Sequence, residues 1–525
     1  MRDYVIAVDV GTGSARAGVV SDDGTLLSRE ERMITLSRPR DHLGEHDGDE
    51  IWAACIHAIR AALAASGISP DRIAALGFDA TCSLVLRQRD GSPLSLREEG
   101  PHRFDTLAWL DHRARAEALE CSRIDHPVLK HTGNVMSPEA EIPKLMWLKR
   151  HRPDLWAEGG LFFDLADYLT FRATGSTARS LCTLASKWSF FGHTRPGWQQ
   201  DFLNRVGLDD LIDTAGLPER GQAVGTAIGT LTPEVADALG LSTQVVVAAG
   251  MVDAYAGALG VLGTTDLSND RQAQVALIGG TSSCLISLSH QPLFRHSLWG
   301  PYYGAIFADL WLVEAGQSAT GALLNHILRL HAQGGEPVTA LHRRVIERIQ
   351  TLRAAEGDPF AATLDVLPDF HGNRSPFADP ALRGVISGLT LDASFDGLCR
   401  LYWRACLGIA LGLRQILEMM VGDAPLPRLH LTGGHVKNPL LTELYADATG
   451  CSVMVADETD AVLVGTAMNA AAACGLHAGL ATAGQRMGPK SRLIQPDPAR
   501  QRVYDQDYAR FLLMQRHRQE LNALR

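Results

Sequence analysis

The chain begins with short apolar runs that are separated by loops of small and polar residues. Two such runs, over 4–8 and 17–20, flank the loop DVGTGSAR at 9–16. A second loop, DDGT at 22–25, precedes another apolar run. Aspartate and glycine between apolar runs are typical of a tight hairpin turn. The pattern therefore predicts antiparallel strands joined by a glycine-rich loop at the start of the fold.

A helix is predicted next, over about 50–65. Apolar side chains recur every four residues between 51 and 63, as on one face of a helix. Asp49 is placed to cap its start and Gly67 to end it. A strand over 73–78 follows and leads to DATCS at 79–83. Strands and helices continue to alternate, so the predicted fold class is α/β.

The opening arrangement recurs halfway along the chain. A strand is predicted over 273–278, the loop GGTSS follows at 279–283, and a returning strand is predicted over 284–288. We therefore expect two similar domains that face each other, each placing a loop of glycine, serine and threonine on one side of a common cleft.

The junction between these domains is predicted near 259–263, after an apolar helix. This gives a first domain over 1–260, a second over 261–490 and a tail over 491–525, whose end at 504–524 has a helical pattern. The 525 residues suffice for more than one domain at roughly 100–200 residues each.

Composition narrows the class of protein. The hydrophobic fraction of 46% and charged fraction of 21% are those of an ordinary globular protein. The net charge is 49 − 59 = −10, and no basic run favours nucleic acid, so a small-molecule partner is expected. Nine cysteines lie scattered without a CxxC pair, as in reduced cytosolic proteins. The first ten residues lack a signal-peptide pattern, so a cytoplasmic location is expected.

Two apolar stretches, 244–263 and 461–480, have the length of a membrane span. Asp253 interrupts the first and His477 the second. Both are interpreted as tightly packed core helices, and no membrane association is expected.

The loop at 9–16 has the chemistry of a phosphate-binding loop, although it matches neither the Walker A nor the dinucleotide pattern. Its glycines let the backbone approach a ligand, and its hydroxyl and guanidinium groups suit phosphate. Asp9, at the end of a strand, is placed to hold Mg²⁺ through water. A plain hairpin turn is the alternative. The candidate phosphate contacts are Gly11, Thr12, Gly13, Ser14 and Arg16.

Two further small-residue loops could contact a nucleotide. The loop at 279–283 offers Gly280, Thr281 and Ser282, with a tight turn as the alternative. The segment LTGGHVKN at 431–438 joins a strand to a helix, where a glycine pair lets a flat ring lie against the backbone. There the alternative is a simple turn.

Asp253 is the candidate catalytic base. It lies in AAGMVDAYAG at 248–257, and a carboxylate among small apolar residues must cap a helix, pair with a cation or act in catalysis. In the catalytic interpretation it accepts the proton of a sugar hydroxyl that attacks the γ-phosphorus of ATP. Helix capping is the alternative.

Other polar residues in apolar settings could bind sugar hydroxyls. They are Trp109, Asp111, Lys187 and Glu314, and a surface or interdomain ion pair is the alternative for each. His371, in PDFHGNRSP at 368–376, could suggest a metal ligand, but a turn fixed by the neighbouring asparagine and proline is favoured.

Taken together, segments between about 4 and 485 resemble the FGGY carbohydrate kinases. The ordered motifs are DVGTGSAR at 9–16, LAWLDHRA at 107–114, FFDLADYLTFRATG at 162–175, GMVDAYAGALG at 250–260, GGTSS at 279–283, EAGQS at 314–318 and TGGHVKNPLLTELYADATG at 432–450. Within the family the chain is most similar to the D-ribulose kinases, on the segments TCSLV at 81–85, TARSLCTLASKW at 177–188 and PDFHGNRSP at 368–376.

The resemblance implies two ribonuclease H-like (actin-like) domains, with ATP and Mg²⁺ as cofactors and a homodimer as a possible assembly. It implies Asp253 as catalytic base and sugar contact, and Asp9 with Asp253 at the magnesium site. It implies nucleotide contacts at Thr281, Gly316, Gly434 and Asn438. It implies sugar contacts at Cys82, Ser83, Asp111, Lys187 and Glu314. The implied reaction converts D-ribulose and ATP to D-ribulose 5-phosphate and ADP.

Two positions depart from the family pattern. Glu141 occupies a place where the family has a small residue or proline, and Leu407 replaces an acid that often precedes a glycine. The alternative substrates are L-ribulose, ribitol and xylulose. A non-catalytic sugar-binding protein of this fold is a further alternative. A chaperone-type ATPase is disfavoured, because about 35 residues follow position 490 and it would need a peptide-binding region there.

Overall fold

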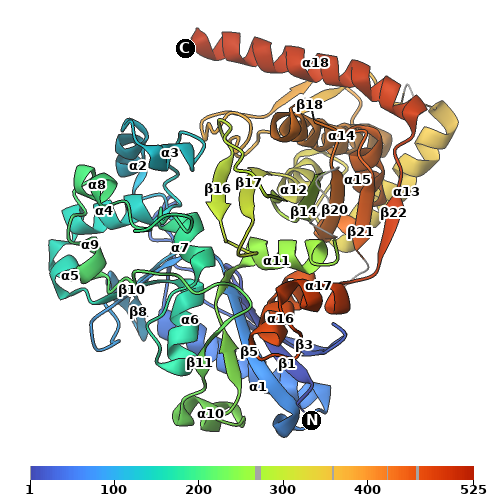
Figure 1. Ribbon diagram of the computed structural model, residues 1–525. Helices are drawn as coiled ribbons and strands as arrows, with labels where there is room; N and C mark the ends of the chain where they lie inside the picture. Colours follow the sequence, from blue (N-terminus) through green and yellow to red (C-terminus); the bar gives the residue numbers. More distant parts are fainter. Residues whose placement is uncertain (1, 266–272, 358–359, 423, 457–459, 525) are drawn as a thin grey trace. The chain divides into compact units, whose positions relative to one another are not determined.

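The computed structural model describes residues 2–265, 273–357, 360–422, 424–456 and 460–524. They form two compact units, and neither unit is continuous along the chain (Figure 1). The first holds the described residues of 1–266, 288–313 and 459–489, and the second those of 267–287, 314–458 and 490–525. These units are defined by contacts, whereas the division into 1–260, 261–490 and 491–525 is linear and stays a prediction.

The first unit is built on a sheet with strand order β11-β12-β5-β1-β2-β3. A short strand, β13, pairs with the end of β5, after the part of β5 that pairs with β12. β1 is antiparallel to β2 and parallel to β5, so the predicted opening hairpin is present. The strands are β1 (Tyr4–Val10), β2 (Ser14–Ser21), β3 (Leu26–Met33), β5 (Ile73–Ala80), β11 (Ala227–Thr230), β12 (Val246–Ala248) and β13 (Met251–Val252).

Helices cover both faces of this sheet, which explains why β1 and β5 are apolar along almost their whole length. On one face, α1 (Gly48–Ser66) packs with alternate side chains such as Val8 and Phe78. Gly77 points to the other face, where a Cβ atom would lie 2.7 Å from the backbone oxygen of Thr466. Thr466 belongs to α16 (Ala461–Ala473), so a late segment of the chain completes the first unit.

The predicted first helix is present, but its cap differs from the prediction. Asp47 caps α1, because its carboxylate accepts hydrogen bonds from the backbone N–H groups of Asp49 and Glu50. Gly67 ends the helix in the left-handed conformation, as predicted. The Asp49 side chain instead accepts a hydrogen bond from Tyr168 and pairs with arginine side chains.

A second, four-stranded sheet in the first unit has the order β10-β6-β9-β4. Its strands are β4 (Glu45–His46), β6 (Leu84–Arg87), β9 (Thr106–Leu107) and β10 (Leu161–Asp164). The other elements of this unit are β7 (Arg97–Glu99), β8 (His102–Phe104), β16 (Trp299–Tyr303), a 3₁₀ turn (Pro70–Arg72), α2 (Arg115–Ser122), α3 (Pro127–Lys130), α4 (Glu141–His151), α5 (Pro153–Glu158), α6 (Leu165–Thr174), α7 (Leu181–Lys187), α8 (Gln200–Arg205), α9 (Leu211–Thr214), α10 (Pro233–Leu239), α11 (Asp253–Leu262) and α17 (Leu480–Met487).

The second unit repeats the strand order of the first. Its sheet includes the series β17-β15-β14-β20-β21-β22, which matches β3-β2-β1-β5-β12-β11 strand for strand. β14 is antiparallel to β15 and parallel to β20, as β1 is to β2 and β5. The strands are β14 (Gln274–Gly279), β15 (Ser283–Ser289), β17 (Trp311–Gln317), β20 (Arg428–Gly433), β21 (Val453–Ala456) and β22 (Ser491–Ile494). The restart predicted near residue 273 is therefore a repeat of topology.

The second unit also contains α12 (Gly321–Leu330), α13 (Thr339–Glu356), β18 (Asp365–Leu367), β19 (Val385–Ser387), α14 (Phe395–Val421), a 3₁₀ turn (Gly434–Lys437), α15 (Pro439–Asp447) and α18 (Pro498–Ala523). α18 begins six residues before the helical pattern that the sequence shows from 504. Among the described residues, no helix is both long and apolar enough to span a membrane.

Candidate active site

Two carboxylates lie side by side at the ends of β1 and β5. Asp9 and Asp79 are register partners on these parallel strands, and both side chains are buried. Asp9 also faces Arg16 across the hairpin and forms an ion pair with it. Arg16 lies 3.6 Å from a second acid, Asp460. The parallel pairing of β1 with β5 thus places two buried carboxyl groups beside the candidate phosphate loop.

Burial dominates the electrostatics of this pair. It raises the pKa of Asp9 to about 7; Arg16 opposes the shift, while Asp253 and Asp460 add to it. Burial and the charge of Asp9 raise the pKa of Asp79 well above its usual range. A cation beside these carboxylates would favour their charged forms.

The residues fit a magnesium ion that keeps most of its water. Within the described parts of the chain, Oδ1 of Asp9 and Oδ1 of Asp79 accept no hydrogen bond from a residue outside this pair, and the two carboxyl groups are close enough to share a proton. No three histidine, cysteine or acidic side chains among the described residues are spaced to hold a metal ion directly. One or two carboxylates with several waters and a phosphate are the usual ligands of Mg²⁺, so this donor set is sufficient.

The glycines of the candidate nucleotide loops have room that the protein itself does not fill. A Cβ atom would lie 3.8 Å from its nearest neighbour at Gly11, Gly280 and Gly434, and 4.0 Å at Gly13. None of the four has a positive φ, so neither packing nor backbone conformation requires glycine there. Glycine would still be required at these positions if a ligand approached the backbone closely, as a nucleotide phosphate does.

Asp253 follows β13, whose two residues pair with Asp79 and Ala80 of β5. It is the first residue of α11, where the helix dipole stabilises a negative charge. Val252, not Asp253, is the capping residue, and Oδ1 of Asp253 accepts a hydrogen bond of 2.7 Å from the N–H of Ala254. Burial is the main cause of the raised pKa of Asp9, Asp79 and Cys82, and the charge of Asp253 adds to each rise, so Asp253 lies near both the acid pair and the candidate sugar segment.

Trp109 connects the phosphate loop to the segment after β5. Its indole N–H donates to the hydroxyl of Thr12 at 2.9 Å, and its backbone N–H donates to the hydroxyl of Ser83 at 3.1 Å. Ser83 in turn lies 3.3 Å from the hydroxyl of Thr81. The structure therefore brings Thr12, Trp109 and Ser83 together. Ser14, by contrast, donates its hydroxyl to Glu31.

Asp111 has the contacts of a structural residue. Its side chain is fully buried, and its oxygens accept hydrogen bonds from the backbone N–H of Gly44 and from the guanidinium of Arg113, at 2.7–2.8 Å. This arrangement favours the ion-pair alternative for Asp111.

Lys187, the last residue of α7, lies near a buried group of charges that the sequence did not indicate. Its charge acts on Glu141, Asp164 and Cys82, opposing the rise that burial causes in the pKa of each. Glu141 and Lys144 lie 3.7 Å apart with no exposed side-chain surface, on adjacent turns of α4. Neither oxygen of Glu141 forms a hydrogen bond within the described residues. Glu141, noted above as a departure from the family pattern, is therefore part of this charged cluster.

In the second unit, the loop between β14 and β15 is tied to the next segments. The N–H groups of Thr320 and Gly321 donate to the carbonyls of Thr281 and Gly280 at 3.0 Å. Nε2 of His435 lies 3.0 Å from the carbonyl of Gly280. Burial lowers the pKa of His435 to about 4, so its imidazole is neutral and donates this hydrogen bond, while Nδ1 accepts one from Tyr445.

The remaining candidates of the second unit lie at strand and helix ends. Asn438 caps α15 through its side-chain oxygen. Glu314, on β17, is mostly buried and accepts a weak hydrogen bond from the thiol of Cys284 at 3.5 Å. Gly316 differs from the other glycines, because a Cβ atom there would lie 2.6 Å from the backbone oxygen of Ser283.

The loop that contains His371 forms the turn that the sequence favoured over a metal site. His371 is exposed, and Asn373 fixes the turn by accepting a hydrogen bond from the N–H of Phe377.

Residues 4–260 match the model of the FGGY family of carbohydrate kinases, N-terminal domain, and residues 275–474 match that of its C-terminal domain. The chain is 38% identical to an FGGY carbohydrate kinase domain-containing protein of Homo sapiens, over 99% of this chain and 98% of that protein. It is 34% identical to a D-ribulokinase of Saccharomyces cerevisiae, over 90% of this chain and 72% of that protein. The fold is similar to that of a xylulose kinase from Lactobacillus acidophilus, with a TM-score of 0.82, 20% identity and 98% coverage of both chains. The fold is thus the two-domain actin-like α/β fold that the sequence predicted.

Proposed function

We propose that this chain, which belongs to the FGGY family of carbohydrate kinases and is a sugar kinase, transfers the γ-phosphoryl group of ATP to a pentulose, and that the pentulose is D-ribulose. Two lines support ribulose as the substrate, and the first of them supports the D configuration. A relative that is 34% identical is named a D-ribulokinase, and several bacterial relatives at 28–30% identity are named ribulokinases.

The observation that carries the proposal is the placement of Asp253. Its charge acts both on the Asp9–Asp79 pair and on Cys82, which belongs to the candidate sugar segment. A base for this reaction must reach the sugar hydroxyl while lying near the transferred phosphoryl group. Asp253 lies at the start of a ten-residue helix whose N-terminus stabilises its negative charge.

In this proposal Asp253 accepts the proton of the sugar hydroxyl whose oxygen attacks the γ-phosphorus, and ADP leaves. Phosphoryl transfer depends mainly on positioning and on neutralising charge. Bound Mg²⁺ would neutralise phosphate charge, and Asp9 and Asp253, with Asp79 beside Asp9, would hold it through water. The backbone of Gly11–Ser14 and the side chain of Arg16 would cradle phosphate oxygens.

The other roles are assigned by position. In the second unit, Gly280–Ser282, Gly316, Gly434 and Asn438 are proposed to contact the nucleotide. In the first, Cys82, Ser83 and Lys187 are proposed to contact the sugar, and Glu314 of β17 is assigned the same role. Asp111 remains the weakest member of this set, since its oxygens are used by Gly44 and Arg113.

A coupled assay of ADP formation over a panel of pentuloses, pentitols and hexoses tests the proposal. D-ribulose is expected to give the highest kcat/KM. A higher kcat/KM for L-ribulose, xylulose or ribitol would reject D-ribulose but keep the kinase. Tight sugar binding by calorimetry without any ATP turnover would instead support a non-catalytic sugar-binding protein.

A further inference from the structure

The last helix of the chain, α18, buries a stripe that ends in polar side chains. The buried positions are Tyr504, Tyr508, Phe511, Gln515 and Arg518, spaced alternately by four and three residues on one helix face. Arg518 has only 5% of its side chain exposed. A buried guanidinium requires an acid or carbonyl partner at hydrogen-bonding distance. The end of this stripe therefore needs particular partner groups, whereas an apolar contact does not.

Arg518 finds those partners beside the loop 368–376. Its Nη1 donates to the carboxylate of Asp369 and, at 3.0 Å, to the carbonyl of Arg383. The other carboxylate oxygen of Asp369 accepts a 2.8 Å hydrogen bond from the amide of Asn373. Asp369 therefore joins α18 to the turn that Asn373 fixes.

The loop 368–376 is bonded in turn to the end of β17. The N–H of Ser375 donates to the carbonyl of Gly316 at 3.2 Å, and the N–H of Gly316 donates to the hydroxyl of Ser375 at 3.4 Å. Four residues after Gly316, the hydroxyl of Thr320 donates to the carbonyl of Gly280 at 3.1 Å. A continuous series of contacts thus runs from α18 to the glycine loop at 280–282, entirely within the second unit.

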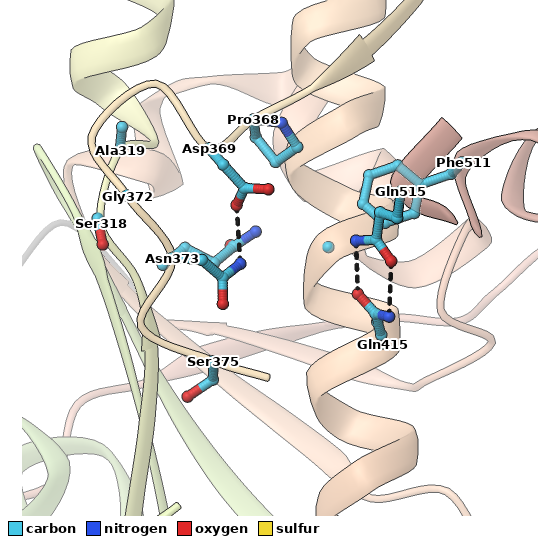
Figure 2. Close-up of a pocket in the computed structure, with 12 residues that line it drawn as sticks. Ser318, Ala319, Pro368, Asp369, Gly372, Asn373, Ser375, Gln415, Phe511 and Gln515 are labelled. Carbon is cyan, nitrogen blue, oxygen red and sulfur yellow. Dashed lines mark hydrogen bonds between the residues drawn. The ribbon is translucent and has the colours of Figure 1, made fainter. Parts of the chain in front are cut away.

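A small cavity lies between these segments. Figure 2 shows a cavity between the loop 368–376, α14 and α18, with the Asp369–Asn373 bond on one side and the Gln415–Gln515 pair on the other. Each amide of that pair donates to the other at 2.9 Å. The cavity volume is about 10 Å³, roughly the space of one water molecule. The direct contact between α18 and the loop is the Arg518–Asp369 ion pair, which lies beside this cavity.

We propose that Arg518 is a positioning residue for the nucleotide half of the active site: by holding Asp369, it fixes the loop 368–376 against Gly316 and thereby sets the position of the glycine loop at 280–282. The inference rests on the proposed function, because it takes that loop as the nucleotide-binding loop. It assigns α18, the segment after the family's C-terminal match at 275–474, a part in ATP affinity.

The test compares Arg518→Met with Arg516→Met in the full-length protein. Arg516 lies two residues away on the same helix and is exposed, so it is a matched control. Arg518→Met is expected to raise the KM for ATP at least about fivefold, the lower end of typical coupling between sites, while the KM for the sugar changes less than about twofold. Arg516→Met is expected to leave both values unchanged, and Arg518→Lys, which keeps the charge, to recover part of the loss.

A folded Arg518→Met protein whose ATP KM stays within about twofold of wild type would overturn the inference, and so would equal increases in both KM values. If Arg518→Met does not fold, Asp369→Asn replaces it as the variant that breaks the contact, and Arg518→Lys remains the variant that keeps the charge. An ATP KM for Asp369→Asn within about twofold of wild type, or equal increases in both KM values, would then overturn the inference. Calorimetric titration with ADP separates this inference from the proposed function. A wild-type protein that binds ADP without turning over any sugar would reject the proposed reaction, whereas weakened ADP binding in Arg518→Met would still support the positioning role.

Discussion

The hydroxyl of Thr466 donates a hydrogen bond to the carboxylate of Asp79, although 387 residues separate the two along the chain. Both side chains are fully buried in the first unit. The bond joins α16 to the end of β5, next to Asp9 on β1. The acid pair at the candidate magnesium site is therefore supported by a helix from the last quarter of the chain.

Thr466→Val is expected to destabilise the protein by about 1–3 kcal/mol, because it leaves the buried Asp79 carboxyl without this donor while keeping side-chain shape. Thermal denaturation measures the effect. Thr170→Val is the matched control, since Thr170 is equally buried on α6 but its hydroxyl donates to the backbone carbonyl of Asp167. Equal midpoints for Thr466→Val and wild type would show that the bond contributes nothing.

Gly465→Ala is also expected to destabilise the first unit, through steric overlap between two helices. A Cβ atom at Gly465 would lie 1.9 Å from the backbone oxygen of Ala256, so α16 and α11 would have to separate. Because Asp253 begins α11, turnover should fall together with the melting temperature. The loss expected for such overpacking is about 1–3 kcal/mol. A variant that melts and turns over like wild type would contradict this close helix contact.

Gly280→Ala is expected to weaken nucleotide binding while leaving stability almost unchanged. The nearest atom to the new methyl group would be 3.8 Å away, so stability should change by less than about 0.5 kcal/mol. A nucleotide phosphate against this backbone would meet the methyl group, so ADP binding measured by calorimetry should weaken. Unchanged ADP affinity in the folded variant would remove Gly280 from the proposed nucleotide contacts.

Stability is expected to fall in acid partly through His435. Burial lowers its pKa to about 4 in the folded protein, below the ordinary value of 6.5. The unfolded chain therefore takes up a proton below pH 6.5 that the folded protein does not, and stability is lost as the pH falls from 6.5 to about 4, by up to about 3 kcal/mol. Above pH 6.5 this contribution is constant.

Melting temperatures of wild type and His435→Gln over this range check the prediction, and the variant should show the shallower decline. Burial also lowers the pKa of His430 to about 4, so this residue causes part of the decline of melting temperature with falling pH in both proteins. His57→Gln, on the exposed side of α1, is the control and should follow wild type. Parallel curves for wild type and His435→Gln would refute the assignment.

Local patterns predicted the elements of this fold better than the long-range pairing between them. The strand–loop–strand unit after residue 4 and its repeat after 273 follow from apolar runs around small-residue loops, and both are present. The return of α16 to the first unit does not follow from any local pattern, because its apolar sequence suits burial in either unit. The cap of α1 shows the limit at short range: Asp47 and Asp49 both precede the apolar face, and only backbone geometry distinguishes them.

Some residues of the candidate site could also be recognised from the sequence, whereas others could be recognised only from the fold. Asp9 and Asp253 were recognisable as acids in apolar surroundings. Asp79 has the same signal, an acid that ends an apolar strand, but its significance comes from the parallel register with Asp9. Glu141 and Lys144 look like an ordinary exposed pair of a helix in sequence, and the absence of any exposed side-chain surface distinguishes them. Burial and register arise from the whole fold, so residue type alone could not reveal these members.

Phosphorylation of a pentulose by ATP with Asp253 as base requires that ADP and sugar phosphate form together. Both products can be measured in one reaction of D-ribulose with ATP, for wild type and for Asp253→Asn. Wild type should form the two products in equal amounts, and the variant should lose about 10²–10⁴-fold in kcat with ADP affinity retained. Wild type that forms no sugar phosphate from any pentulose, or an Asp253→Asn protein that turns over at a comparable rate, would contradict the account.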